Sequence, residues 1–438
     1  MNMMKETLPG MTLGPLDDTM VDPLTKGMPP GVGAMRLGDI GAQGWNMLRG
    51  DLPFPIAVIR DDRLRANSAW MRDFTTANGL ELAPHGKTTM APHLYDLQVS
   101  DGAWGITLAT AQQVLVAHRF GVGRVVLANQ PIGRQNIDAC FSVLHGTDGI
   151  ELYCLADSIE GVVALAEGAT RNPPPEGNPL RVLVEVGFAG GRTGVRSGAA
   201  ALELARAVAA APGLAFAGIE CFEGVAPDPD AAAALVDDIV AAGHAVVAAG
   251  LLPDGAPLVL SAGGSAFFDR VGERLNAAGF ARPVVSVLRS GCYLTHDVMG
   301  YARAFERIQR ETSLIQPEGG LEPALEVWAL VQSRPDADKV IVTMGKRDVG
   351  SDAGLPKPMW LYRDDGTMSG PEAMPEGHEV QALNDQHCHM TVPPDSRLRV
   401  GDMVGFGIGH PCTTFDKWKL LMIVDDDYTV TKAIMTFF

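Results

Sequence analysis

The sequence predicts a fold of the α/β plus all-β class, namely a (β/α)8 TIM barrel followed by a C-terminal β-domain. Between residues 56 and 288, short β-type runs alternate about eight times with Ala-rich helical stretches, an order that indicates a parallel sheet. No glycine-rich dinucleotide fingerprint follows the first run, which favours a closed barrel over an open doubly wound sheet. After about Glu311 the helical stretches stop, and β-type runs alternate with Gly, Pro and Asp turns.

The chain is too long for one ordinary core, so we divide its 438 residues into three parts. Residues 1–50 are an N-terminal extension, 51–311 the barrel and 312–438 the β-domain. The extension is rich in Met, Gly and Pro with little periodicity, and we expect it to lie along the surface. The Pro-rich segment 172–179 separates two barrel units and is not a domain linker.

Each expected element is a local run of one residue type. Helical stretches over 68–77 and 110–119 separate the first three barrel strands. The expected barrel strands are 56–59, 105–108, 124–127, 149–154, 180–186, 214–220, 258–261 and 284–288, and those of the β-domain are 324–331, 339–344, 402–406 and 420–424.

Composition excludes several classes of function. Lys+Arg 35 against Asp+Glu 52 gives a net charge of −17, without a basic stripe, so we expect a small-molecule partner rather than nucleic acid or anionic lipid. We find no basic start followed by an apolar core and no run near the roughly 20 apolar residues of a membrane span, and we expect a cytoplasmic protein. Six widely spread cysteines predict reduced, buried side chains.

Lys87 is the candidate covalent catalyst. It lies in Pro-His-Gly-Lys-Thr-Thr, residues 84–89, just after the apolar Leu80, Leu82 and Ala83. Partial burial would favour the neutral amine, which is the nucleophilic form and the one that makes Schiff bases. The alternative is a solvated loop lysine.

This segment resembles the Pro-His-x-Lys-Thr-His pattern of fold-type III pyridoxal phosphate enzymes, specifically the D-serine dehydratase and D-threonine aldolase group. Thr89 stands where that family has a second histidine. The likeness continues through residues 102–110 and 125–130. The resemblance implies an alanine racemase-like barrel with a β-domain, a homodimer, and pyridoxal 5'-phosphate held by Lys87 with His85 beside it.

A glycine pair follows an expected late barrel strand, in Ser-Ala-Gly-Gly-Ser over 261–265. Loops at this place in TIM barrels bind phosphate through backbone N–H groups, which glycine allows to approach closely. A glycine pair is otherwise a common turn. A similar Ser-x-Gly-Gly-Thr segment in the family implies that Gly263, Gly264 and Ser265 bind the cofactor phosphate.

Two more segments resemble strand ends of this family. Arg192 lies in a segment similar to Gly-x-x-Arg-x-Gly-Val, and its fork of donors could pair with a substrate carboxylate or the cofactor's phenolic oxygen. An exposed loop arginine is the alternative. The segment after the last strand resembles Arg-Pro-Gly-Thr-Tyr, with Ser290 and Cys292 as replacements, and places Tyr293 near the cofactor. Because Phe222 stands where the family often has tyrosine, the group that meets the pyridine nitrogen stays open.

His410 and Cys412 are the candidate metal ligands. Two residues apart, they would face one way in an extended segment, and nitrogen and thiolate ligands favour zinc, with Mg or Mn as alternatives. A buried cysteine beside a structural histidine is the simpler interpretation, but dehydratases of the family carry His-x-Cys where aldolases typically carry His-x-Asp. A rival site of His387, Cys388 and His389 is disfavoured, because adjacent strand residues point to opposite faces.

These residues predict a pyridoxal phosphate- and metal-dependent lyase that converts 3-hydroxy D-amino acids such as D-serine or D-threonine into a 2-oxo acid and ammonia. Lys87 would remove the Cα proton, the cofactor would accept the electrons, and the metal would bind the β-hydroxyl as a Lewis acid. Retro-aldol cleavage to glycine and an aldehyde is the main alternative. Racemisation and a noncatalytic cofactor carrier leave the His-x-Cys segment unexplained.

Overall fold

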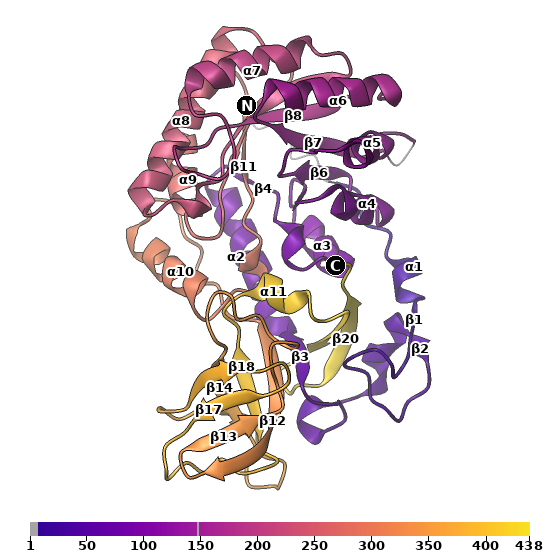
Figure 1. Ribbon diagram of the computed structural model, residues 1–438, viewed down its shortest axis with the longest axis vertical. Helices are drawn as coiled ribbons and strands as arrows, with labels where there is room; N and C mark the ends of the chain where they lie inside the picture. The colour runs from indigo at the N-terminus through magenta and orange to yellow at the C-terminus, as the bar shows by residue number, and fades with distance from the viewer. Residues whose placement is uncertain (1–7, 147–148) are drawn as a thin grey trace.

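The protein is described here by a computed structural model that covers residues 8–146 and 149–438. Figure 1 shows the barrel at the top, the C-terminal β-domain below it and the N-terminal extension along one side. The short helix α11 (Pro411–Phe415) lies where the two domains meet. This junction positions the site described below.

The barrel sheet has eight parallel strands in the order β4, β11, β10, β9, β8, β7, β6 and β5, which confirms the predicted fold class. A parallel bridge from His85 to Thr107 links β4 to β5 and closes the ring. The strands are β4 (Glu81–Leu82), β5 (Ile106–Leu108), β6 (Arg124–Leu127), β7 (Glu151–Ala156), β8 (Leu180–Glu185), β9 (Leu214–Glu220), β10 (Leu258–Ala262) and β11 (Val284–Leu288).

Helices surround this sheet, and four of them begin at a polar residue that caps the first turn. Thr110, Ser158, Ser197 and Asp228 each accept a hydrogen bond from the backbone N–H three residues on, which replaces a missing intrahelical bond. The helices are α2 (Asp61–Ala77), α3 (Pro92–Ser100), α4 (Ala111–Arg119), α5 (Arg134–Ser142), α6 (Ile159–Arg171), α7 (Gly198–Ala210), α8 (Pro229–Ala248), α9 (Phe268–Ala277) and α10 (Gly300–Glu311).

The first expected barrel strand was assigned wrongly. The run at 56–59 forms β3 (Ile56–Arg60), which pairs with β12 and β19 in the C-terminal sheet. The barrel starts instead with β4, only two residues long. All five residues of β3 are buried, and a strand buried on both faces has the same apolar pattern in either sheet. Its partner strands therefore decide where it belongs.

The β-domain is built on a ten-stranded sheet, whose main path runs β15, β14, β18, β12, β13, β17, β16, while β3, β19 and β20 branch from it. All four expected β-domain runs are strands, and the short helix α11 is an addition to the predicted all-β character. The strands are β12 (Leu325–Asp336), β13 (Lys339–Val342), β14 (Lys357–Tyr362), β15 (Glu372–Ala373), β16 (Glu379–Leu383), β17 (Cys388–Thr391), β18 (Met403–Gly407), β19 (Leu420–Val424) and β20 (Val430–Met435).

The N-terminal extension packs on the β-domain. It contains α1 (Gly14–Asp17), β1 (Met20–Val21) and β2 (Met35–Arg36). Buried Ile40 and Met47 share an apolar core with Trp328 of β12. Residues 1–7 of this expected extension lie outside the described residues.

Helix α8 corrects one expectation about membranes. It has the length and apolar composition of a membrane span, although the sequence suggested no such run. The helix packs against α7, α9 and the barrel strands β9 and β10, and 44% of its most apolar window is buried inside the protein. The apolar residues of α8 therefore fit a helix of the layer that surrounds the barrel strands.

Candidate active site

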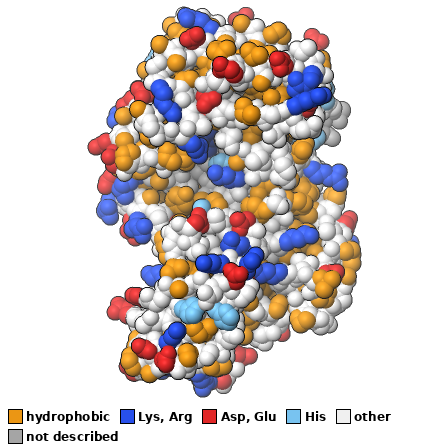
Figure 2. All heavy atoms as spheres, in the orientation of Figure 1, with side chains coloured by type: hydrophobic (Ala, Val, Ile, Leu, Met, Phe, Trp, Pro, Cys, Tyr) orange, Lys and Arg blue, Asp and Glu red, His pale blue; other side chains and the backbone are white. Residues whose placement is uncertain are grey.

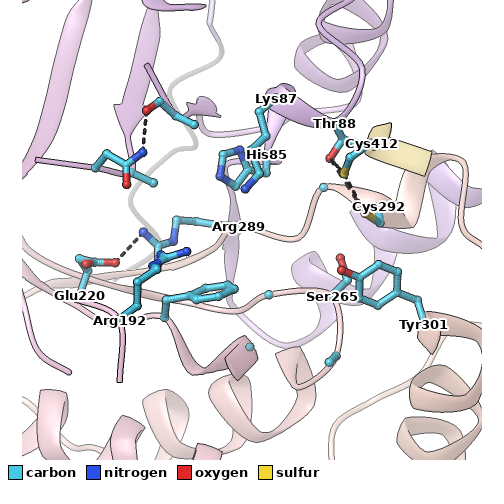
Figure 3. Close-up of a pocket in the computed structure, with 18 of the residues that line it drawn as sticks. His85, Lys87, Thr88, Arg192, Glu220, Ser265, Arg289, Cys292, Tyr301 and Cys412 are labelled. Atoms are coloured by element: carbon cyan, nitrogen blue, oxygen red, sulfur yellow. Dashed lines mark hydrogen bonds and ion pairs between the residues drawn. The ribbon is translucent and has the colours of Figure 1, made fainter. Parts of the chain in front are cut away.

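A cavity of about 280 Å³ lies where the carboxyl ends of the barrel strands face α11. Figure 2 shows the molecule hollowed between the barrel and the β-domain, with Lys and Arg side chains at the hollow. Figure 3 shows the side chains that point into this cavity. Its polar lining residues include His85, Lys87, Thr88, Asn129, Glu185, Arg192, Glu220, Ser265, Arg289, Cys292, Tyr301, His410 and Cys412.

Lys87 reaches this cavity from a one-turn 3-10 helix, Gly86–Thr88, directly after β4. Gly86 is required there because a Cβ atom would lie 2.7 Å from the Tyr95 ring, whose hydroxyl donates to the Gly86 carbonyl at 2.9 Å. The Lys87 side chain is exposed to the cavity rather than partly buried as expected. A free amine at the end of the first barrel strand is placed for covalent chemistry.

His85 precedes this turn and also lines the cavity. Burial lowers the pKa of His85 well below its usual value, and the nearby positive charges of Lys87 and Arg289 lower it further. The ring is therefore neutral. Its Nδ1 atom is buried and has no hydrogen-bond partner within the described residues, so it can serve a bound molecule.

Arg289 and Glu220 form a buried ion pair that the sequence analysis did not single out. Their side-chain atoms lie 2.6 Å apart, and Arg289 also donates to the Cys221 carbonyl at 2.6 Å. Burial raises the pKa of Glu220 to about 7, against the opposing effect of Arg289. Both residues stand at the carboxyl ends of barrel strands, the position at which charged residues read as functional. Their position at the ends of predicted barrel strands was the feature of the sequence that could have identified them.

Arg192 lies in the cavity wall, as the sequence predicted. Its guanidinium lies over the ring of Phe222 at 4.8 Å, a cation–π contact. The arginine is exposed and makes no ion pair with another described residue. Its donors are free for an anion, and its role toward the cofactor or substrate stays a prediction.

The glycine loop differs from the predicted phosphate site. The N–H groups of Gly263 and Gly264 donate to the carboxylate of Glu223, at 2.9 and 2.7 Å. They are therefore not free for a phosphate, because each N–H has a single proton. Gly264 and Ser265 still line the cavity, whereas Gly263 does not.

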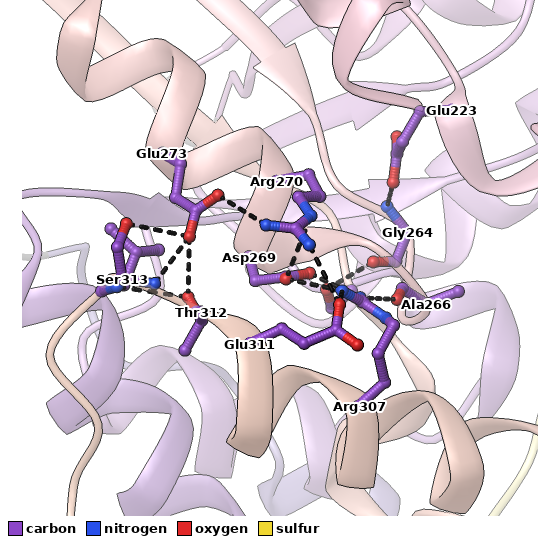
Figure 4. Close-up of polar contacts among 12 residues, drawn as sticks. Glu223, Gly264, Ala266, Asp269, Arg270, Glu273, Arg307, Glu311, Thr312 and Ser313 are labelled. Carbon is purple, nitrogen blue, oxygen red and sulfur yellow. Dashed lines mark hydrogen bonds and ion pairs between the residues drawn. The ribbon is translucent and has the colours of Figure 1, made fainter. Parts of the chain in front are cut away.

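A second contact fixes the same loop from below. Arg307 of α10 donates to the Ala266 carbonyl at 3.0 Å and forms an ion pair with Asp269 at 2.7 Å (Figure 4). The loop is thus held between Glu223 and Arg307, and the Ser265 side chain lies in the cavity beside Tyr301 (Figure 3).

Tyr293 also differs from its prediction. The residue is buried, its hydroxyl accepts a hydrogen bond from Gln98 at 3.0 Å, and it does not line the cavity. Tyr301, eight residues on, faces the cavity instead. Cys292 is the first residue of a one-turn 3-10 helix, Cys292–Leu294, which places Cys292 at the cavity and Tyr293 toward Gln98 of α3.

His410 and Cys412 do meet at the cavity, but not on an extended segment. His410 is the N-cap residue of α11, and Asp352 holds its Nδ1 atom at 2.6 Å. The hydrogen bond to Cys412 raises the pKa of His410 to about 9. Hydrogen bonds with Cys292, His410 and Thr88 lower the pKa of Cys412 to about 4, although burial opposes this shift. The result is a thiolate beside an imidazolium.

Of the rival segment, Cys388 and His389 lie on β17 and His387 directly precedes it, and none of the three lines the cavity. Cys388 is buried, while His387 is exposed and His389 contacts Asn384 at 2.6 Å. Within residues 8–146 and 149–438, no three His, Cys, Asp or Glu side chains are already grouped to hold an ion.

The lining residues fit the groups that the sequence resemblance implied. An aldehyde-bearing, phosphorylated cofactor needs an amine, cationic or hydroxyl donors and close backbone approach, and Lys87, Arg192 and Ser265 supply the side chains. At Gly291, a Cβ atom would lie 2.6 Å from the His85 carbonyl, so only glycine fits this part of the wall. Cys412 supplies a thiolate, and His410 would supply an imidazole on losing its second ring proton; both are ligands that zinc prefers.

Several proteins similar to this chain are named as enzymes of D-amino acids. A 3-hydroxy-D-aspartate aldolase of Paracoccus denitrificans (strain Pd 1222) is 27% identical over 329 residues, which are 72% of this chain and 77% of that protein. The structure of a D-threonine aldolase from Filomicrobium marinum matches with a TM-score of 0.71 and 25% identity, over 88% of this chain and 95% of that one. A D-threo-3-hydroxyaspartate dehydratase variant solved in a metal-free form shares the fold, with a TM-score of 0.68 and 22% identity over 90% and 99% of the two chains.

Family models cover both domains of the chain. The model described as a putative serine dehydratase domain matches residues 324–424, and the model of the alanine racemase N-terminal domain matches residues 59–304, more than half of the chain. With the barrel, the β-domain and the Lys87 cavity in place, the chain belongs to the alanine racemase N-terminal domain family, within the fold-type III pyridoxal phosphate enzymes.

Proposed function

We propose that this protein is a pyridoxal phosphate- and metal-dependent dehydratase of 3-hydroxy D-amino acids such as D-serine or D-threonine. One observation carries the proposal: a single cavity has the Lys87 amine on one wall and the His410–Cys412 pair on another. The Lys87 amine can take the proton from the Cα atom of an amino acid, and an ion held by His410 and Cys412 can bind its β-hydroxyl. A 3-hydroxy amino acid carries both reacting groups on adjacent carbons.

The barrel residues would bind the cofactor and move the Cα proton. Lys87 would hold pyridoxal phosphate covalently and, once released by substrate, would take the Cα proton as a general base. Bound pyridoxal phosphate supplies an electron sink for the electrons left at Cα. We assign the phosphate to the cavity side of Ser265 and the substrate carboxylate or the phenolic oxygen to Arg192, because neither side chain has a hydrogen bond or ion pair with another described residue.

His410 and Cys412 would hold the divalent ion, with zinc favoured by the thiolate. The ion would supply Lewis acidity at the β-hydroxyl, which is otherwise a poor leaving group. Asp352 fixes the orientation of the His410 ring through Nδ1, an arrangement typical of carboxylate–histidine–metal sites.

A D-amino-acid aldolase is the second candidate. The Paracoccus and Filomicrobium proteins named above are aldolases, which favours retro-aldol cleavage. The Cys412 thiolate favours the dehydratase, since the resemblance associates His-x-Cys with elimination and His-x-Asp with the aldolases. Both reactions would use the Lys87 amine and the ion held by His410 and Cys412, so the two functions are distinguished by their products.

Product analysis after incubation with D-threonine tests the proposal. The dehydratase gives 2-oxobutanoate and ammonia, whereas the aldolase gives glycine and acetaldehyde. Lys87→Ala is the matched control, because it should form neither pair. If cofactor- and metal-loaded wild-type protein converts neither D-threonine nor D-serine, the proposed substrate class is wrong.

A further inference from the structure

A second sulfur atom lies beside the proposed metal ligand. Cys292 Sγ is 3.7 Å from Cys412 Sγ, and Thr88 Oγ1 is 3.3 Å from the same Cys412 sulfur. Cys292 comes from the barrel, after β11, whereas Cys412 comes from α11 of the β-domain. Figure 3 shows the two sulfur atoms facing each other at the cavity edge.

The separation of the two sulfur atoms suits one shared ion. Zinc binds thiolates at about 2.3 Å with tetrahedral angles, which places two bound sulfur atoms about 3.8 Å apart. The observed 3.7 Å is therefore compatible with a common ion without a change in the sulfur–sulfur distance. His410 already hydrogen-bonds the Cys412 sulfur, so the three side chains form one connected group.

The number of ligands also points to Cys292. Catalytic zinc sites usually have three protein ligands and one open position for water or substrate, and two cysteines with one histidine are a known set. His410 and Cys412 supply only two. Other acidic side chains near the cavity are engaged elsewhere, since Asp352 holds His410 and Glu220 pairs with Arg289.

We propose that Cys292 is the third protein ligand of the ion that the proposed function requires. Cys292, His410 and Cys412 would bind it together and leave one position open for the substrate hydroxyl. The inference rests on the proposed function, because that function requires the ion. Thr88 would stay outside this set, as a hydroxyl that hydrogen-bonds the Cys412 sulfur.

Binding would replace protons with the ion. Hydrogen bonds join Cys412 to both Cys292 and His410, and metal ligation requires deprotonated thiolates and a free imidazole nitrogen. In the described part of the chain no three such side chains yet enclose one position, so Cys292 and His410 would close on the ion around Cys412. Two thiolates would also select zinc over Mg or Mn, which prefer oxygen ligands.

This ligand would be particular to this chain. The resemblance places a threonine where Cys292 stands, and a threonine hydroxyl is a poor substitute for a thiolate toward zinc. Cys292→Thr is therefore a conservative probe in both size and family context. Cys388→Ala is its matched control, because Cys388 is also a buried free cysteine but lies on β17, outside the cavity lining.

X-ray absorption of the zinc-loaded protein counts sulfur neighbours directly. We expect two sulfur ligands in the wild type and in Cys388→Ala, and one in Cys292→Thr. Zinc affinity, measured by chelator competition, should fall more than about 100-fold in Cys292→Thr, beyond the 10–100-fold typical of residues that only support a ligand. Circular dichroism checks that the variant folds, and Cys292→Ser serves if the threonine is not tolerated.

The outcomes separate this inference from the proposed function. One sulfur in the wild type, or the same affinity in wild type and Cys292→Thr, would overturn the role of Cys292 and leave the dehydratase proposal standing. Failure of the wild type to bind zinc or any other divalent ion in a one-to-one ratio would overturn both. Two sulfur neighbours that fall to one only in Cys292→Thr or a Cys412 variant would support the third ligand.

Discussion

Both ends of the barrel are hollow and charged, but they differ in how their charges are paired. The end opposite the candidate active site holds the larger cavity, about 520 Å³ against about 280 Å³. There Glu151 binds Arg124 at 2.6 Å and Arg181 at 3.1 Å and accepts a hydrogen bond from Tyr153. The carboxylate of Glu151 and the two arginines are therefore paired with one another.

The active-site end leaves polar groups available. Lys87 and Arg192 make no ion pair with another described residue, His85 Nδ1 is buried without a partner, and burial raises the pKa of Glu220. Incomplete pairing and shifted pKa values of this kind are typical of functional sites. The comparison teaches that pairing, rather than cavity size, identifies the chemical end of this barrel.

Removal of the Lys87 amine should have the largest effect. Lys87→Ala should lower activity on D-threonine at least about 10³-fold, because the chain loses both its covalent attachment and its base. Borohydride should fix pyridoxal phosphate to wild-type protein, and peptide mapping should place it on Lys87. If Lys87→Ala still turned over D-amino acids at the original rate, the unpaired amine would have no role. Unpaired charge would then not mark the functional end of the barrel.

Metal removal should have the next largest effect. Chelation, or Cys412→Ala, should reduce elimination by more than about 10²-fold and leave the covalent attachment at Lys87 intact, because the ion acts at the β-hydroxyl. Cys412→Asp should retain part of the metal affinity and shift products toward glycine and acetaldehyde. Full activity in metal-stripped protein would reduce Cys412 to a packing residue.

Glu220→Gln tests the raised pKa at the active-site end. A carboxyl whose pKa is raised on folding, here to about 7 from an ordinary 4.5, stabilises the protein fully below pH 4.5, and this contribution is lost as pH rises to 7. Between pH 4.5 and 7 the free energy of unfolding of the wild type should therefore fall by about 1–3 kcal/mol relative to that of Glu220→Gln. Urea unfolding at several pH values measures it, and parallel curves for the two proteins would contradict the shift.

Glu151→Gln should have the smallest effect on activity and tests the opposite end. Burial alone would raise the pKa of Glu151, but Arg124 and Arg181 outweigh it and lower the pKa. The ion pairs should therefore stabilise the wild type above pH 4.5, by about 1–3 kcal/mol, and this advantage should fade as pH falls further. Activity should stay within about twofold, and a large loss of activity would show that this end also serves the reaction.

The sequence by itself determined the two-domain architecture and the segment that carries Lys87. Strands such as β6 and β10 are apolar runs because they are buried on both faces of a parallel sheet, so the pattern is local and readable. The helix predicted over 110–119 was close to α4, whose capping residue Thr110 acts within three residues of itself. The helix predicted over 68–77 starts earlier, at Asp61, directly after β3. The sequence also singled out His410 and Cys412, which line the cavity, but from the start of a helix and not from an extended segment; their role as metal ligands stays a prediction.

The tertiary structure decided which distant residues meet. In the folded chain β3 pairs within the C-terminal sheet, and the N–H groups of Gly263 and Gly264 donate to Glu223. Tyr301 rather than Tyr293 lines the cavity. These choices depend on partners that are far apart in the chain, such as two cysteines separated by 120 residues whose sulfur atoms come within 3.7 Å. Local residue patterns carry no information about such pairings, because packing of the whole chain sets them.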